Sequence, residues 1–150
     1  MSTLTSPVPI VLIGIHTEIG GPVAEGLRPD WDVVRFTQTF EAAKADLPHL
    51  IEGREPPNPP TNEVGSGKYG RPVRAVCLGR GFTQQQAETL RELYDGRAKE
   101  PLLWVAGAAA KKPSGNMPPA GFEKIAIRNF RDNLENWKKQ GASKGELILY

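Results

Sequence analysis

Apolar and polar positions along the chain form two kinds of segment. Five short runs are mostly apolar and rich in β-branched residues, which is typical of parallel strands buried on both faces. Four longer stretches repeat apolar residues every three or four positions, which predicts amphipathic helices. The expected strands cover 10–15, 31–36, 73–78, 101–106 and 146–150, and the expected helices cover about 20–28, 40–51, 84–94 and the stretch before Gly141.

Local signals predict where several helices begin and end. The stretch 37–39, Thr-Gln-Thr, supplies an N-cap for the second helix, while Thr83 and Gln86 have the capping-box spacing before the third. Pro48 has no backbone N–H, so it is expected to end or kink the second helix early. The last helix has the clearest pattern, and its expected buried stripe consists of Ile127, Phe130, Leu134 and Trp137.

Strands that alternate with helices predict an α/β fold. Right-handed crossovers place helices on both faces of a mostly parallel sheet. The 150 residues therefore predict one domain, 1–150, with a doubly wound five-stranded sheet. Both a Rossmann-like strand order and a flavodoxin-like order, 2-1-3-4-5, fit the pattern. Each of them places ligands at the carboxyl edge of the sheet, near the switch point.

Two long loops interrupt this alternation, at 52–72 and at 107–121. The first one clusters proline, glycine and polar residues and shows no apolar periodicity, which predicts an irregular or partly disordered segment. Loops of this length inside a compact domain are uncommon. A mobile insertion, an active-site lid and a partner-binding arm are the three alternatives for the loop at 52–72.

The first strand runs into a glycine-rich turn, 13–20, with the sequence IGIHTEIG. Together with Ala24, Leu27 and the pair Val33-Val34, this turn resembles the opening of the short-chain dehydrogenase/reductase family, which has a Gly-x-x-x-Gly-x-Gly pattern. Gly14 and Gly20 match the first and third glycines, but Glu18 stands at the middle position, where a carboxylate would repel a pyrophosphate. The resemblance implies a degenerate, Rossmann-like NAD(P)-binding domain. It does not extend to catalysis, because none of the three tyrosines has a lysine four residues on.

Three turns at the predicted carboxyl edge carry the candidate binding residues, and they predict a site for an anionic or phosphate-bearing small ligand. NADP or another nucleotide is the candidate cofactor, with Arg35 as the contact to a 2′-phosphate. Alternatively, the glycines only allow a tight turn between strand and helix. The candidate ligand contacts are Gly14, His16, Thr17, Gly20, Gly21, Arg35, Thr37, Gly79 and Arg80.

Two rival functions remain open at this stage. One is a domain that interacts with proteins or forms a homo-oligomer on a degenerate dinucleotide-binding scaffold, through the proline-rich loop or the fifth strand. The other is a small hydrolase, transferase or isomerase that uses His16 and Glu18 as an acid/base pair, because both groups titrate and share one turn.

Composition narrows the classes of function. A formal net charge of +2, spread along the chain, gives no basic stripe for nucleic acid. No run approaches the roughly 20 apolar residues of a membrane span, and no secretory leader is recognisable, so a cytoplasmic location is expected. Cys77 is the single cysteine, which excludes an internal disulfide, and with His16 and His49 it forms no metal-binding spacing. Cys77 is expected to be a small core residue.

Overall fold

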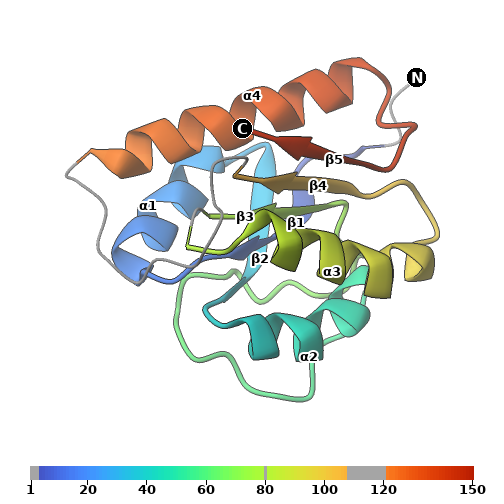
Figure 1. Cartoon of the computed structure of the whole chain (residues 1–150), viewed down its shortest axis with the longest axis horizontal. Coiled ribbons are helices and arrows are strands. Elements are labelled where there is room, and N and C mark those ends of the chain that lie inside the picture. Colours follow the sequence, from blue (N-terminus) through green and yellow to red (C-terminus); the bar gives the residue numbers. More distant parts are fainter. Residues whose placement is uncertain (1–3, 80, 108–120) are drawn as a thin grey trace.

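The computed structural model describes residues 4–79, 81–107 and 121–150, which form one five-stranded sheet flanked by helices (Figure 1). All neighbouring strands are parallel, in the order 2-1-3-4-5. The doubly wound α/β fold is thereby confirmed, and the flavodoxin-like order is the one observed. The elements are β1 (Val8–Ile13), α1 (Thr17–Leu27), β2 (Trp31–Thr37), α2 (Phe40–Ile51), β3 (Ala75–Leu78), α3 (Gln84–Tyr94), the 3-10 turn η1 (Asp95–Arg97), β4 (Leu103–Ala106), α4 (Phe122–Lys139) and β5 (Glu146–Leu149).

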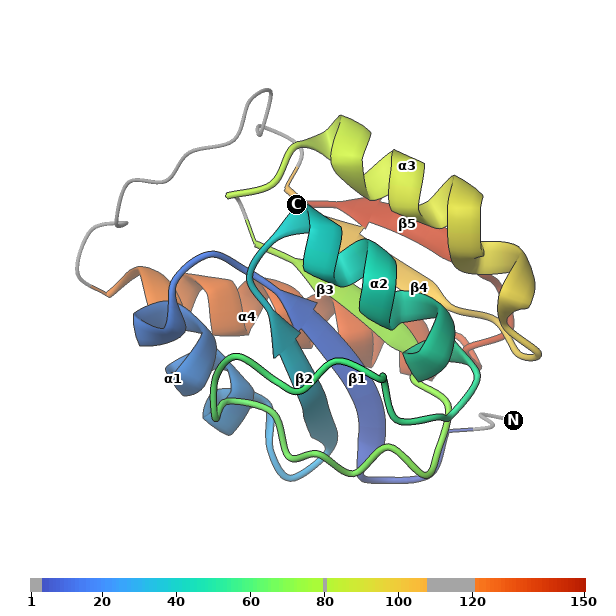
Figure 2. The same ribbon diagram turned by 90° about the horizontal axis from the view of Figure 1, so that it is seen from below.

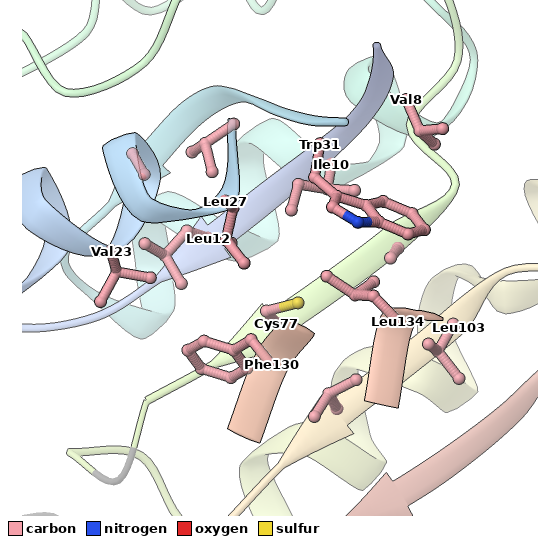
Figure 3. Close-up of a cluster of buried hydrophobic side chains, with 14 of the residues drawn as sticks. Val8, Ile10, Leu12, Val23, Leu27, Trp31, Cys77, Leu103, Phe130 and Leu134 are labelled. Atoms are coloured by element: carbon pink, nitrogen blue, oxygen red, sulfur yellow. The ribbon is translucent and has the colours of Figure 1, made fainter. Parts of the chain in front are cut away.

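The helices cover the two faces of the sheet in pairs. α1 and α4 pack against each other on one face, and α2 and α3 do so on the other (Figure 1). Successive residues of β1 contribute to opposite cores, as expected for a strand buried on both faces. Figure 3 shows the core beneath α4, where Cys77 lies among Leu12, Phe130 and Leu134. The prediction that Cys77 is a core residue is confirmed.

Most predicted helix boundaries agree with the structure. The Thr39 side chain accepts a hydrogen bond from the backbone N–H of Ala42, and Thr83 and Gln86 form the reciprocal capping box. Phe130, Leu134 and Trp137 of the predicted α4 stripe are buried, and Ala126 is buried with them. Ile127 is partly buried against the same core and lies beside α1, where a Cβ at Gly26 would stand 2.5 Å from its terminal methyl group.

Pro48 lies inside α2 and does not end it, since the helix covers the predicted range and continues to Ile51. Proline at this position leaves the carbonyl of Lys44, four residues earlier, without its helical donor. The hydroxyl of Tyr94 on α3 donates a 2.8 Å hydrogen bond to that carbonyl. A neighbouring helix thus satisfies the group that Pro48 leaves open.

The loop at 52–72 lies along the outer edge of β2 (Figure 2). The backbone N–H groups of Ser66 and Gly67 donate to the carbonyls of Val33 and Val34, at 2.9 and 3.0 Å. Gly65 allows this approach, because a Cβ there would lie 2.5 Å from the carbonyl oxygen of Val34. The segment has no helix or strand, as predicted, but it caps an edge that would otherwise expose open backbone groups. None of the three alternatives for this loop anticipated that role.

Candidate functional site

The turns after β1, β2 and β3 adjoin at the carboxyl edge of the sheet. The backbone N–H of Gly14 donates to the carbonyl of Thr37 at 3.0 Å, and the N–H of Gly79 donates to the carbonyl of Ile13 at 2.8 Å. The turn that contains Gly14 is therefore held between the other two. The predicted convergence of these three segments is observed for the described residues, whereas Arg80 lies outside them.

Phe36, a β2 residue that was not among the predicted site residues, explains why two of the predicted ligand contacts are glycine. A Cβ at Gly14 would lie 2.9 Å from the Phe36 ring, and a Cβ at Gly20 would lie 2.6 Å from it. Real Cβ atoms do not approach a buried ring so closely, so both positions require glycine for packing alone. Gly21, by contrast, has no atom within 4 Å of its virtual Cβ.

α1 begins at Thr17 rather than at the predicted Gly20, so Glu18 belongs to its first turn. The residue before the helix, His16, has extended backbone, and its carbonyl accepts from the N–H groups of Ile19 and Gly20 at 3.1 and 2.9 Å. The sequence pattern missed this extra turn because Thr17 and Glu18 are polar and show no apolar periodicity.

The carboxylate of Glu18 occupies the positive end of the α1 dipole. The Thr17 hydroxyl donates to it at 2.9 Å, and this hydrogen bond, together with one from the backbone and the nearby His16, lowers the pKa of Glu18 although slight desolvation opposes the shift. A carboxylate that stays ionised at neutral pH is a poor general acid and a weak base. It also competes with any anion for the same helix end.

Arg35 lies beneath the loop on the α2 face of the sheet. Its Nε donates to Asp46 at 2.9 Å, and its other two nitrogens donate to the hydroxyl of Tyr69 and the carbonyl of Asn58 at 3.3 and 2.8 Å. Burial raises the pKa of Asp46, and the adjacent Arg35 charge partly offsets that effect. Contact with a 2′-phosphate would have to break this buried pair, so the placement of Arg35 speaks against its predicted role.

Polar groups that the prediction missed also reach the carboxyl edge. The side-chain amide of Gln38 donates to the carbonyl of Ile15 at 2.9 Å, and the hydroxyl of Tyr150 donates to the carbonyl of Leu78 at 3.0 Å. Tyr150 follows a parallel strand, which is the signal that could have placed it here. The predicted Thr37 ends β2 at the same edge of the sheet, and within the described residues its buried hydroxyl oxygen has no hydrogen-bond partner.

Cys77 is the next-to-last residue of β3, and its side chain is buried. Burial raises the pKa of Cys77 to about 12, which keeps the thiol protonated and unreactive at neutral pH. No group of three or more histidine, cysteine, aspartate or glutamate side chains in the described part of the chain is placed to hold a metal ion. None of the helices in the same ranges is both long and apolar enough to cross a membrane.

The strand order and the adjoining turns define a doubly wound α/β protein, a class in which ligands bind at the carboxyl edge of the sheet, here where β1 and β3 end. No family model matches the chain, and no solved structure matches it. The chain is similar to Kojic acid related protein 6 from Aspergillus oryzae, with 23% identity over 134 residues. The matched region covers 89% of this chain and 80% of that protein, so this distant similarity extends over most of both chains.

Proposed function

We propose that the chain binds a small anionic ligand, with a nucleotide as the phosphate-bearing candidate, at the carboxyl ends of β1 and β3. The observation that carries this proposal is the strand order 2-1-3-4-5. In such sheets the crossovers on either side of the first strand run to opposite faces, and the loops part to leave a crevice between strands one and three. A Cβ at Gly79 would make ordinary van der Waals contacts with the backbone of Ile13 and Gly14, at 3.6 and 3.9 Å, so packing among the described residues does not explain a glycine at this position.

We expect the anion to bind on the β3 side of the crevice rather than at the start of α1. Glu18 already places a carboxylate at the start of α1, and Phe36 accounts for Gly14 and Gly20 without a phosphate. The segment Gly79-Arg80 supplies the predicted cation beside β3. On this proposal the glycine turn forms a wall of the crevice, and Arg80 provides the charge that a phosphate or carboxylate requires.

Isothermal titration calorimetry with NADPH, NADH, FMN and ATP tests the proposal. Kojic acid belongs in the same series, since the relative from Aspergillus oryzae carries that compound in its name. Arg80→Ala should weaken binding of the anionic ligand, whereas Arg28→Ala, which removes an exposed charge after the far end of α1, should not. Glu18→Gln should tighten binding by removing a negative charge. If none of the four nucleotides binds, the nucleotide version is refuted.

A non-enzymatic interaction domain is the second candidate. The difference between the two edges of the sheet favours it. The β2 edge is covered by the loop at 52–72, whereas β5 pairs with β4 on one side and with no other described strand. Its Leu149 side chain is 38% exposed. An edge of this kind can pair with another chain. Light scattering after size exclusion should then show a defined oligomer, and a monomer that loses ligand binding on Arg80→Ala would contradict it.

A further inference from the structure

A concave surface lies at the amino edge of the sheet, opposite the carboxyl edge described above. It is a cavity of about 490 Å³, bounded by the start of β1, the end of α2 and the segments that lead into β3 and β4. Figure 2 shows these parts at the same end of the molecule as the N-terminus. A volume of this size is typical of small-molecule sites. No sequence motif pointed to it, because its residues come from four separate segments.

Positive charge is concentrated around this cavity. Its lining carries an excess of three positive charges, which is more than the formal net charge of +2 of the whole chain. A concave surface lined by charges of one sign focuses the field and attracts small ions of the opposite sign. The cationic side chains are Arg54, Arg71, Arg74, Arg97 and Lys99, and the carboxylates are Glu52 and Glu100.

Glu52 is shared between two of these cations. The guanidinium groups of Arg54 and Arg97 both contact the same Glu52 oxygen, at 3.0 and 3.3 Å. The hydrogen bond from Arg54 is the main cause that lowers the pKa of Glu52, and the two arginine charges add to the effect against slight desolvation. One carboxylate cannot neutralise two guanidinium groups, so one positive charge remains at this wall.

Other lining residues contribute further positive charge. Arg71 donates to the backbone carbonyls of Pro7 and Thr5 at 2.7 and 2.8 Å, and these neutral acceptors leave its charge uncompensated. Lys99 is exposed at the rim. Arg74 forms an ion pair with Glu100, so this pair adds little net charge.

Part of the lining is apolar. Leu4, Pro72 and Ala98 line the cavity and are exposed or partly exposed. A hydrated inorganic ion gains little from such a surface, whereas the body of an organic anion can pack against it. We propose that this cavity binds a small molecule that carries at least two carboxylate or phosphate groups on a short apolar body. The site is separate from the proposed function, because it lies at the other edge of the sheet.

Titration calorimetry at constant ionic strength, with citrate and methylenediphosphonate as probes and acetate as a monovalent comparator, tests this proposal. Saturable binding of citrate, of methylenediphosphonate or of both, but not of acetate, is expected. Binding of one probe alone identifies carboxylate or phosphate as the preferred group. The double variant Arg97→Gln/Lys99→Gln should bind roughly tenfold more weakly, because two charged contacts to the anion are lost.

A control variant that removes the same number of charges elsewhere shows whether the loss of binding is specific to the cavity. Lys124→Gln/Arg128→Gln removes two exposed cations of α4 that do not line the cavity, and it should bind the probes like the wild type. Arg80→Ala should also leave this binding unchanged, which distinguishes the two edges of the sheet. Thermal melts confirm that each variant is folded. Absence of saturable binding, wild-type affinity in the cavity variant, or equal losses in the cavity variant and the α4 control would each overturn the proposal.

Discussion

The contact between Gly20 and Phe36 makes a sharp prediction about why the turn after β1 is rich in glycine. Alanine at position 20 would place its Cβ 2.6 Å from the Phe36 ring, which is only 3% exposed and has little room to move. Overpacking of a dense core costs about 1–3 kcal/mol. Alanine within a helix also gains roughly 1 kcal/mol over glycine, which offsets part of that cost.

Gly21 supplies the matched control, since it is the next residue of α1 and its virtual Cβ meets no atom within 4 Å. Gly21→Ala should therefore gain the helix-propensity term alone. Because both variants share that term, Gly20→Ala should be less stable than Gly21→Ala by about 1–3 kcal/mol. Urea unfolding followed by tryptophan fluorescence measures this difference, with a slope of about 1–3 kcal/mol per molar urea.

A third variant assigns the difference to the ring. In a Phe36→Leu background the Cβ at position 20 has more room, so the gap between the two alanine variants should shrink in a double-mutant cycle. Equal stability of Gly20→Ala and Gly21→Ala would refute the packing explanation. Contact with a ligand would then again be a candidate reason for glycine at position 20.

Three other predictions follow from the buried contacts. Gly65→Ala should detach the loop from β2 and speed its cleavage in limited proteolysis, whereas Gly70→Ala, with no neighbour within 4 Å, should not. Asp46→Ala should destabilise the fold by about 3–5 kcal/mol in urea unfolding, because it leaves Arg35 as a buried, unpaired charge, and Arg35→Met/Asp46→Leu should recover most of that loss. Cys77 should react with a thiol reagent such as DTNB only in urea, and rapid labelling of the folded protein at pH 8 would contradict its burial and its pKa of about 12.

The fold could be predicted from the sequence because each element has its own local signal. Apolar runs located the five strands, and the Thr83 capping box located the start of α3. The strand order could not be read, since it depends on which hydrophobic faces meet across long connections. The contact that lets α2 continue past Pro48 could not be read either, because Tyr94, which satisfies the open carbonyl, lies 46 residues further along the chain.

The candidate site was predicted in position but not in its contacts. Turns after parallel strands must meet at one edge, and they do so here at Gly14, Thr37 and Gly79. The role of each side chain depended on partners distant in sequence. Arg35 was predicted to contact a phosphate because it lies near the end of the second strand, where dinucleotide-binding domains contact the ribose. In the structure, Asp46 of the next helix pairs with Arg35.

The contacts of Phe36 and Glu18 weaken the argument that the glycines bind a ligand, so the argument for a ligand now depends on charged side chains. A glycine pattern points to a cofactor only when no protein atom fills the space above the glycines, and Phe36 fills it over Gly14 and Gly20. The α1 N-terminus cannot serve as a vacant anion site either, because Glu18 already provides its counter-charge. On our proposal, an anion at the carboxyl edge depends on Arg80, the residue after Gly79 in the sequence, so Arg80→Ala is the variant that distinguishes a ligand-binding domain from one that works through protein contacts.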